Sequence, residues 1–129
     1  MVLALIAAGG DTVDQGAAFF AYMGVAAALV FANLGASYGT AKSGVGIASL
    51  SVIDSQKITK SLIPIIMAGI LGIYGLIIAI LLSAKAADVK LTAGDGYKMF
   101  SAGLCCGLSS LASGLAIGTA GEAGVKAYA

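Results

Sequence analysis

Three long stretches without a charged side chain constrain this chain more than any other feature. They cover residues 16–41, 62–84 and 99–121. Each is longer than the roughly 20 residues with which a helix, rising 1.5 Å per residue, crosses the hydrocarbon core of a bilayer. Lipid offers no partner for backbone N–H and C=O groups, so a spanning segment is a helix or part of a closed barrel. Because the apolar residues do not alternate with a period of two, the sequence predicts an all-α membrane protein, with one domain over residues 1–129.

The composition excludes several classes of function. Charged residues make up 10% of the chain, against about 25% in a soluble domain. Because no basic patch is present, we expect no nucleic-acid partner. It has no histidine and only two cysteines, the adjacent Cys105 and Cys106, which we interpret as small buried apolar residues rather than as a redox or metal site. There is no nucleophile–base pair and no cofactor motif, so we expect no catalytic, cofactor-binding or metal-binding residues.

Polar segments separate the three stretches. We expect a connection from Ser43 to Lys60 and a second one from Lys85 to Lys98, interrupted by glycines around Asp95. Ser61 is predicted to cap the second helix, with Pro64 in its first turn. Residues 1–8 are apolar but short and lack a preceding basic residue, so we interpret them as an N-terminal tail, with a processed leader as the alternative.

The lysines indicate an orientation. If all three stretches span, one side of the membrane holds four lysines and the other holds three. The positive-inside rule then favours a cytoplasmic first connection and an N-terminus on the outer or luminal side. The larger group consists of Lys42, Lys57, Lys60 and Lys126.

Glycines recur inside the stretches at a spacing of four residues. Such patterning of small residues lets helix backbones approach closely. It is typical of ordinary pairing between membrane helices, and equally of a tight ring of helices, and the spacing alone leaves both interpretations open. The glycines predicted to pack between helices are Gly35, Gly39, Gly103, Gly107, Gly114 and Gly118.

The chain also contains an internal repeat. Residues 35–41 read GASYGTA and residues 114–120 read GLAIGTA, a shift of 79 positions that also pairs Gly24 with Gly103. The third stretch is therefore interpreted as a copy of the first. A complete duplication would place a copy of the second stretch beyond Ala129, so we expect a protein of two helical hairpins whose last helix lies beyond the sequence given.

Four glycine-rich strings stand out, residues 34–46 (LGASYGTAKSGVG), 64–76 (PIIMAGILGIYGL), 103–107 (GLCCG) and 114–125 (GLAIGTAGEAGV). They resemble the c-type proteolipid of V-type proton ATPases, the 16 kDa proteolipid family, and the resemblance extends from Phe19 to Val125.

That resemblance implies a four-helix proteolipid, formed by duplication of a hairpin, of which several copies build a ring in the membrane. The ring turns as ATP is hydrolysed elsewhere in the complex, so this chain hydrolyses nothing itself. Implied partners are other copies of the chain, the a-type stator protein of the V-ATPase, its central-stalk proteins, the lipid bilayer and protons. The implied location is the vacuole or another acidifying endomembrane.

The resemblance also implies where the ion site lies. In that family, protons are carried by one glutamate in the fourth helix, because a proton-carrying side chain must be able to become neutral where it faces lipid. That glutamate lies five residues before a tyrosine like Tyr74, and the corresponding residue here is Gly69. The carrier is therefore expected beyond Ala129, and we interpret the sequence as incomplete. By resemblance Tyr74 lines the proton site, and the alternative is a tyrosine that fills space between helices.

Other polar residues have plainer interpretations. Glu122 is the single glutamate, and Lys126 follows four residues later, which favours a solvated pair at a helix end over an ion carrier. Asn33 is expected to bridge helices rather than bind an ion. Lys57 and Lys60 are predicted at a solvated loop edge, which by resemblance contacts the central stalk.

The sequence thus predicts a rotor-ring component of a V-type, ATP-driven proton pump. The alternative is a structural ring or helix-packing component without an ion site of its own. A sodium-carrying version of the first function is not distinguished by these residues.

Overall fold

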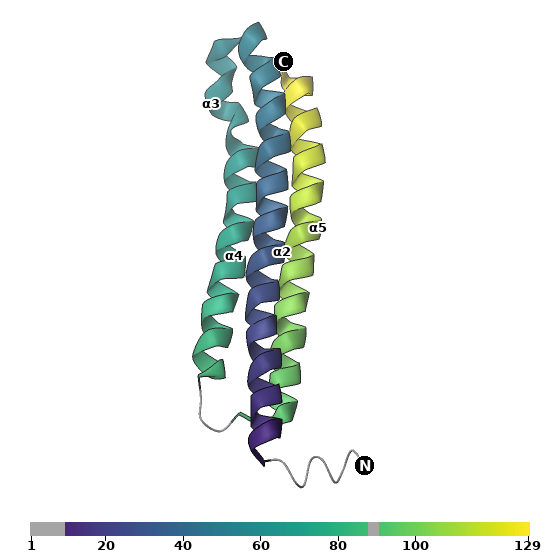
Figure 1. Cartoon of the computed structure of the whole chain (residues 1–129). Coiled ribbons are helices and arrows are strands. Elements are labelled where there is room, and N and C mark those ends of the chain that lie inside the picture. Colours follow the sequence, from purple (N-terminus) through teal and green to yellow (C-terminus); the bar gives the residue numbers. More distant parts are fainter. Residues whose placement is uncertain (1–9, 88–90) are drawn as a thin grey trace.

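Three long helices lie side by side and make up nearly all of the structure (Figure 1). The computed structural model describes residues 10–87 and 91–129, and these contain helices and no strand. The all-α prediction is therefore confirmed. The interpretation of residues 1–8 as a tail, and part of the second predicted connection, lie outside the described residues. The elements are α2 (Gly10–Ile53), the 3-10 turn η1 (Ser55–Lys57), α3 (Ile58–Ser61), α4 (Ile63–Ala86) and α5 (Ala93–Tyr128).

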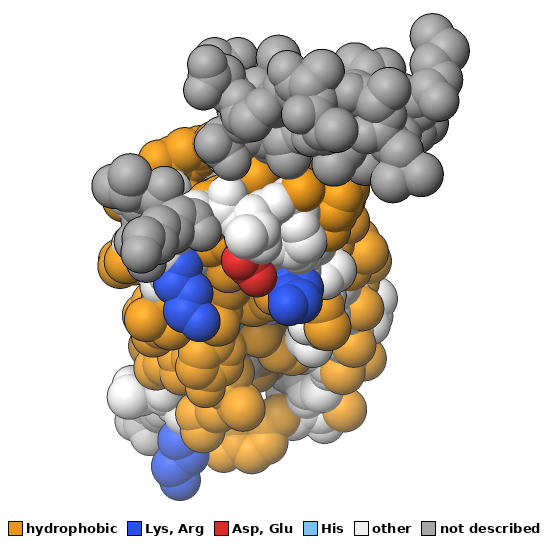
Figure 2. Space-filling view, turned by 90° about the horizontal axis from the view of Figure 1, so that it is seen from below, with side chains coloured by type: hydrophobic (Ala, Val, Ile, Leu, Met, Phe, Trp, Pro, Cys, Tyr) orange, Lys and Arg blue, Asp and Glu red, His pale blue; other side chains and the backbone are white. Residues whose placement is uncertain are grey.

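All three long helices can cross a membrane. The segments that are long and apolar enough are Gly16–Ile53, Ser55–Ala86 and Ala93–Tyr128. Large side chains such as Ile66 and Ile80 lie exposed on the bundle, at 61% and 58%. Viewed along the bundle, the sides are mostly hydrophobic, and charged side chains gather at the end (Figure 2). Such an apolar exterior suits lipid rather than water, and the protein is an integral membrane protein.

The first connection is much shorter than the sequence predicted, and the prediction of a polar segment from Ser43 to Lys60 was wrong. Helix α2 continues to Ile53 because its last turns bury apolar side chains. Leu50 is fully buried beside Ile47 and Val125 of α5. The chain reverses only at Asp54, whose carboxylate accepts a hydrogen bond of 3.0 Å from the Gln56 backbone N–H.

The helix starts also differ in detail from the prediction. Ser61 does not cap α4, because it belongs to α3 and its hydroxyl donates to the Lys57 carbonyl at 3.1 Å. Pro64 does lie in the first turn of α4, as predicted. The glycines around Asp95 do not break the chain, because Thr92 caps α5 and the helix begins at Ala93. The Thr92 hydroxyl donates to the Asp95 carboxylate at 2.6 Å and accepts from its backbone N–H.

Candidate functional site

Glycines bring the backbones of α2 and α5 into direct contact. A Cβ atom added to Gly35 would lie 2.5 Å from the Ser110 carbonyl oxygen, and one added to Gly114 would overlap the Gly35 backbone. Gly24 and Gly103 face each other in the same way. A side chain of any size would force the helices apart at these points. The two glycines of each pair are 79 positions apart, which is the shift of the internal repeat. The two copies of the repeat therefore pack against each other.

The other glycines singled out by their spacing also lie between helices. Gly39 touches both α4 and α5, since a Cβ there would lie 2.9 Å from the Ala68 Cβ and 3.0 Å from a carbonyl oxygen of α5. Gly107 and Gly118 face α2, where a Cβ at each would come within 3.1 Å of an aromatic side chain. The structure thus gathers these residues along the α2–α5 contact, with Gly39 also against α4, and their part in contacts between copies stays a prediction.

A shallow groove of about 320 Å³ lies between α2 and α4 near the middle of the bundle. Asn33 is the one side chain in its lining with a polar group, and it does not make the interhelical hydrogen bond that the sequence suggested. Its Nδ2 donates to the carbonyl of Leu29 in its own helix at 2.8 Å, while its Oδ1 lies against Gly72 of α4. The lining residues are Leu29, Asn33, Ala36, Gly69, Gly72, Ile73 and Leu76.

The two positions tied to the family's ion site lie apart on α4. Gly69 forms part of the groove, and a Cβ there would meet nothing within 4 Å. Tyr74 is 55% exposed and is not part of the groove lining. The exposed ring is free to contact another helix, and its role beside a proton site stays a prediction.

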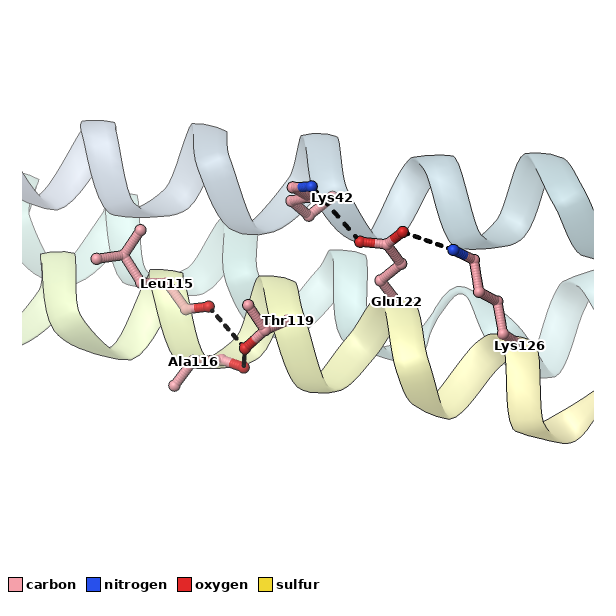
Figure 3. Close-up of polar contacts among 6 residues, drawn as sticks. All are labelled: Lys42, Leu115, Ala116, Thr119, Glu122 and Lys126. Atoms are coloured by element: carbon pink, nitrogen blue, oxygen red, sulfur yellow. Dashed lines mark hydrogen bonds and ion pairs between the residues drawn. The ribbon is translucent and has the colours of Figure 1, made fainter.

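Glu122 lies between two lysines at the end of the bundle where α5 ends (Figure 3). Its Oε1 accepts a hydrogen bond of 2.7 Å from the Lys126 Nζ, which confirms the predicted pair. Its Oε2 lies 3.7 Å from the Nζ of Lys42, a contact between α5 and α2 that local spacing could not reveal. Glu122 lies within α5 rather than in a loop. Exposed ion pairs of this kind contribute little to stability.

The adjacent cysteines are less buried than predicted. Cys105 is exposed and Cys106 is half-buried, because α2 and α4 cover only the opposite side of α5. Within residues 10–87 and 91–129, no group of three His, Cys, Asp or Glu side chains is placed to hold a metal ion. Cys105 therefore faces whatever surrounds the three-helix bundle.

Ser43 is a buried polar residue that the sequence did not single out. Its hydroxyl is fully buried and has no hydrogen-bond partner among the residues that the structure describes. A Cβ added to Gly121 of α5 would lie 2.5 Å from this hydroxyl oxygen.

Since an unsatisfied buried polar group costs about 1–3 kcal/mol, we expect Ser43→Ala to stabilise the purified protein by about 1 kcal/mol. The midpoint of unfolding by SDS in detergent micelles measures this. The exposed Ser37, whose hydroxyl donates to the Leu34 carbonyl, gives the control Ser37→Ala, which should change stability little. A loss of stability in Ser43→Ala alone would show that the hydroxyl is satisfied.

Comparison with known proteins agrees with this architecture. A family model described as the C subunit of ATP synthase matches residues 23–82. The V-type proton ATPase 16 kDa proteolipid (the c-type proteolipid) of Ascaris suum is 52% identical over 115 residues, which cover 88% of this chain and 71% of the relative. The Homo sapiens protein of that name is 51% identical over 113 residues, or 88% and 72% of the two chains. The c 2 form from Caenorhabditis elegans is 51% identical over 115 residues, covering 88% and 71%. The chain therefore belongs to the family of V-type proton ATPase 16 kDa proteolipids.

Proposed function

We propose that this chain is a rotor-ring component of a V-type, ATP-driven proton pump in an acidifying endomembrane. The observation that carries the proposal is the identity of about half of all residues with V-type proteolipids, over 88% of the chain. The close backbone contact between α2 and α5 supports it, because helices that pack tightly in a ring need small residues where they touch. The chain contributes to ion movement by rotation and carries out no hydrolysis.

We further propose that residues 16–41, 62–84 and 99–121 are the parts that lie in the hydrocarbon. The last turns of α2 and α5 then project from the bilayer on one side. The ion cluster of Lys42, Glu122 and Lys126 supports this placement, because charged side chains favour the bilayer surface over its centre. The lysines of the turn after α2, Lys57 and Lys60, lie beyond it and are suited to contact the central stalk. Tyr74, exposed on α4, is suited to face the proton path completed by the a-type stator protein.

A second function, a structural ring component without its own ion site, is favoured by the absence of a carboxylate from the three stretches. None of the three uncharged stretches contains a carboxylate, and Gly69 of the second helix is only the repeat counterpart of the family's fourth-helix glutamate. A ring component of this composition could pack in the rotor without carrying an ion on these helices. The two functions share the ring and differ in whether this chain supplies a carboxylate to it.

One experiment tests both functions. The pump complex is isolated from the native membrane through an affinity tag on another of its proteins, and the intact mass and C-terminal sequence of this protein are measured. Vesicles from cells depleted of the protein are assayed for ATP-dependent acidification. Presence in the complex and loss of acidification on depletion would support the rotor function. A further apolar segment with a glutamate would identify a carrier, and a mass equal to that of the 129-residue chain would favour the structural role. Absence from the complex, with acidification intact, would refute both.

A further inference from the structure

A groove of about 380 Å³ lies between α5 and the chain that returns through α3 and α4. It is found at the end of the bundle that α3 and the last turns of α5 share (Figure 1). Apolar side chains form most of its wall, and a lysine and a tyrosine add polar groups. The residues of the wall on which the inference depends are Lys60, Ile63, Pro64, Gly124, Val125 and Tyr128.

The groove lies at the edge of the proposed hydrocarbon region. Gly121, the last residue of the third uncharged stretch, belongs to its wall, and a Cβ there would lie 3.0 Å from the Cβ of Pro64. Pro64 is near the start of the second uncharged stretch, which covers residues 62–84. Lys60 and Tyr128 lie outside both stretches. The groove therefore extends from the hydrocarbon at its apolar end to the headgroup layer at its polar end.

Lys60 brings a positive charge to the groove that no described residue neutralises. The nearby carboxylates are engaged by other lysines, Asp54 by Lys57 at 3.7 Å and Glu122 by the two lysines of its cluster. Within the described part of the chain, no acidic side chain contributes to the wall. A lysine can lay its stem along apolar surface and keep its amine among headgroups. The Lys60 amine is therefore available for an anion.

Tyr128 and Lys57 extend the polar end of the groove. The Lys57 Nζ lies 5.5 Å from the centre of the Tyr128 ring, within the range of a cation–π contact. Tyrosine, with an apolar ring and a hydroxyl, suits the interface between hydrocarbon and water. Two ammonium groups and a phenol hydroxyl thus stand beside an apolar wall. Ammonium and hydroxyl groups donate hydrogen bonds, and phosphate oxygens accept them.

We propose that this groove binds an anionic phospholipid, with the Lys60 Nζ donating to its phosphate and one acyl chain beginning against Ile63 and Val125. A phospholipid fits because its phosphate and its acyl chains already lie at these two levels of the bilayer. Basic pockets between membrane helices bind anionic headgroups on the cytoplasmic side, and the lysines predict that this end is cytoplasmic. The bound headgroup would lie beneath the turn proposed to meet the central stalk. The inference rests on the membrane placement proposed above, and it requires neither rotation nor an ion site.

Photolabelling of the intact complex tests the occupant. The tagged pump complex is reconstituted into phosphatidylcholine vesicles that contain phosphatidylserine with a photoreactive group at the start of one acyl chain. After illumination, mass spectrometry of peptides locates the label, which we expect in residues 60–64 and 120–128. Phosphatidylcholine with the same photoreactive group should label these residues about fivefold less, the effect of one lysine near an anionic surface.

A charge variant tests the role of Lys60. Lys60→Gln keeps the length of the side chain and removes its charge, so labelling by phosphatidylserine should fall about fivefold, to the level given by phosphatidylcholine. The matched control is Lys85→Gln in the last turn of α4, at the opposite end of that helix. It should leave labelling of the groove unchanged. An equal fall in both variants would show that the charge of Lys60 has no special role.

A shape variant tests the groove itself. A Cβ at Gly124 would meet nothing within 4 Å, so Gly124→Leu should fill the groove without forcing the helices apart. It keeps every charge, yet labelling of residues 60–64 and 120–128 should be lost. The control is Gly44→Leu on α2, where a Cβ also meets nothing within 4 Å and which is not part of the wall. Labelling of Gly124→Leu at the wild-type level would place the lipid on the outer surface and refute the inference.

Failure of this inference can be told apart from failure of the proposed function. If the protein copurifies with the pump and neither segment is labelled, another helix, a second copy or a stalk protein covers the groove. The lipid site is then wrong and the rotor function stands. Equal labelling by the two lipids would likewise overturn the anionic site alone. If the protein is absent from the pump but its groove is labelled selectively by phosphatidylserine after separate purification, the rotor function fails and the lipid site stands.

Discussion

Replacing Gly114 by alanine is expected to push α5 away from α2 and to destabilise the protein by about 3 kcal/mol, the upper end of the usual cost of overpacking. The new methyl group would overlap the backbone of Gly35, which cannot move aside as a flexible side chain could. Alanine favours a helix over glycine by about 1 kcal/mol in water, and the overlap outweighs that gain. The shift in the midpoint of SDS unfolding, followed by circular dichroism, measures the effect.

Gly44→Ala is the matched control, because a Cβ at Gly44 would meet nothing within 4 Å. It should leave stability unchanged or raise it slightly through helix propensity. In cells the two variants should also differ, since a widened α2–α5 contact in every copy would disturb ring assembly and ATP-dependent acidification. Equal behaviour of Gly114→Ala and Gly44→Ala would mean that α2 and α5 do not touch at their glycines.

The sequence was sufficient to predict the three helices and their close contact. Long uncharged stretches permit only one kind of structure in lipid, and Gly35 and Gly114 could be matched through the repeat before any contact was known. The partner of each glycine was not predictable. Spacing shows which residues share a helix face, whereas the crossing of two helices is decided by the full set of side chains between them.

Connections and polar contacts were harder to predict. Residues 43–53 look like a loop because they are rich in serine and glycine, yet Leu50 and Ile47 are buried and keep the segment helical. Tertiary packing here overrides local composition. The Lys42–Glu122 contact joins residues far apart in the chain, and the exposure of Cys105 depends on which side of α5 the other helices cover. The residues that neighbour each of these features in the sequence do not indicate it.

Leu50→Ala is expected to cost about 2–5 kcal/mol, as is usual when a fully buried leucine is truncated. Leu50 is among the largest fully buried side chains. It holds the end of α2 against Val125 of α5 and against Ile58 and Ile65, which begin the return through α3 and α4. Loss of this side chain should therefore loosen the turn with Lys57 and Lys60 before it affects the middle of the bundle. Hydrogen exchange of the backbone amides measures this locally, and SDS unfolding measures the total.

The control is Leu81→Ala on the exposed surface of α4, where truncation leaves no cavity and should change stability far less. Exchange should accelerate in residues 45–62 of the Leu50 variant and stay slow around Gly35 and Gly114, since glycine contacts hold the middle of the bundle independently.

In the pump, the Leu50→Ala variant should still assemble into a ring but couple rotation to ATP hydrolysis poorly, because the loosened turn is the surface proposed to meet the stalk. Fast exchange throughout α2 would instead show that the buried end and the glycine contact form a single cooperative unit.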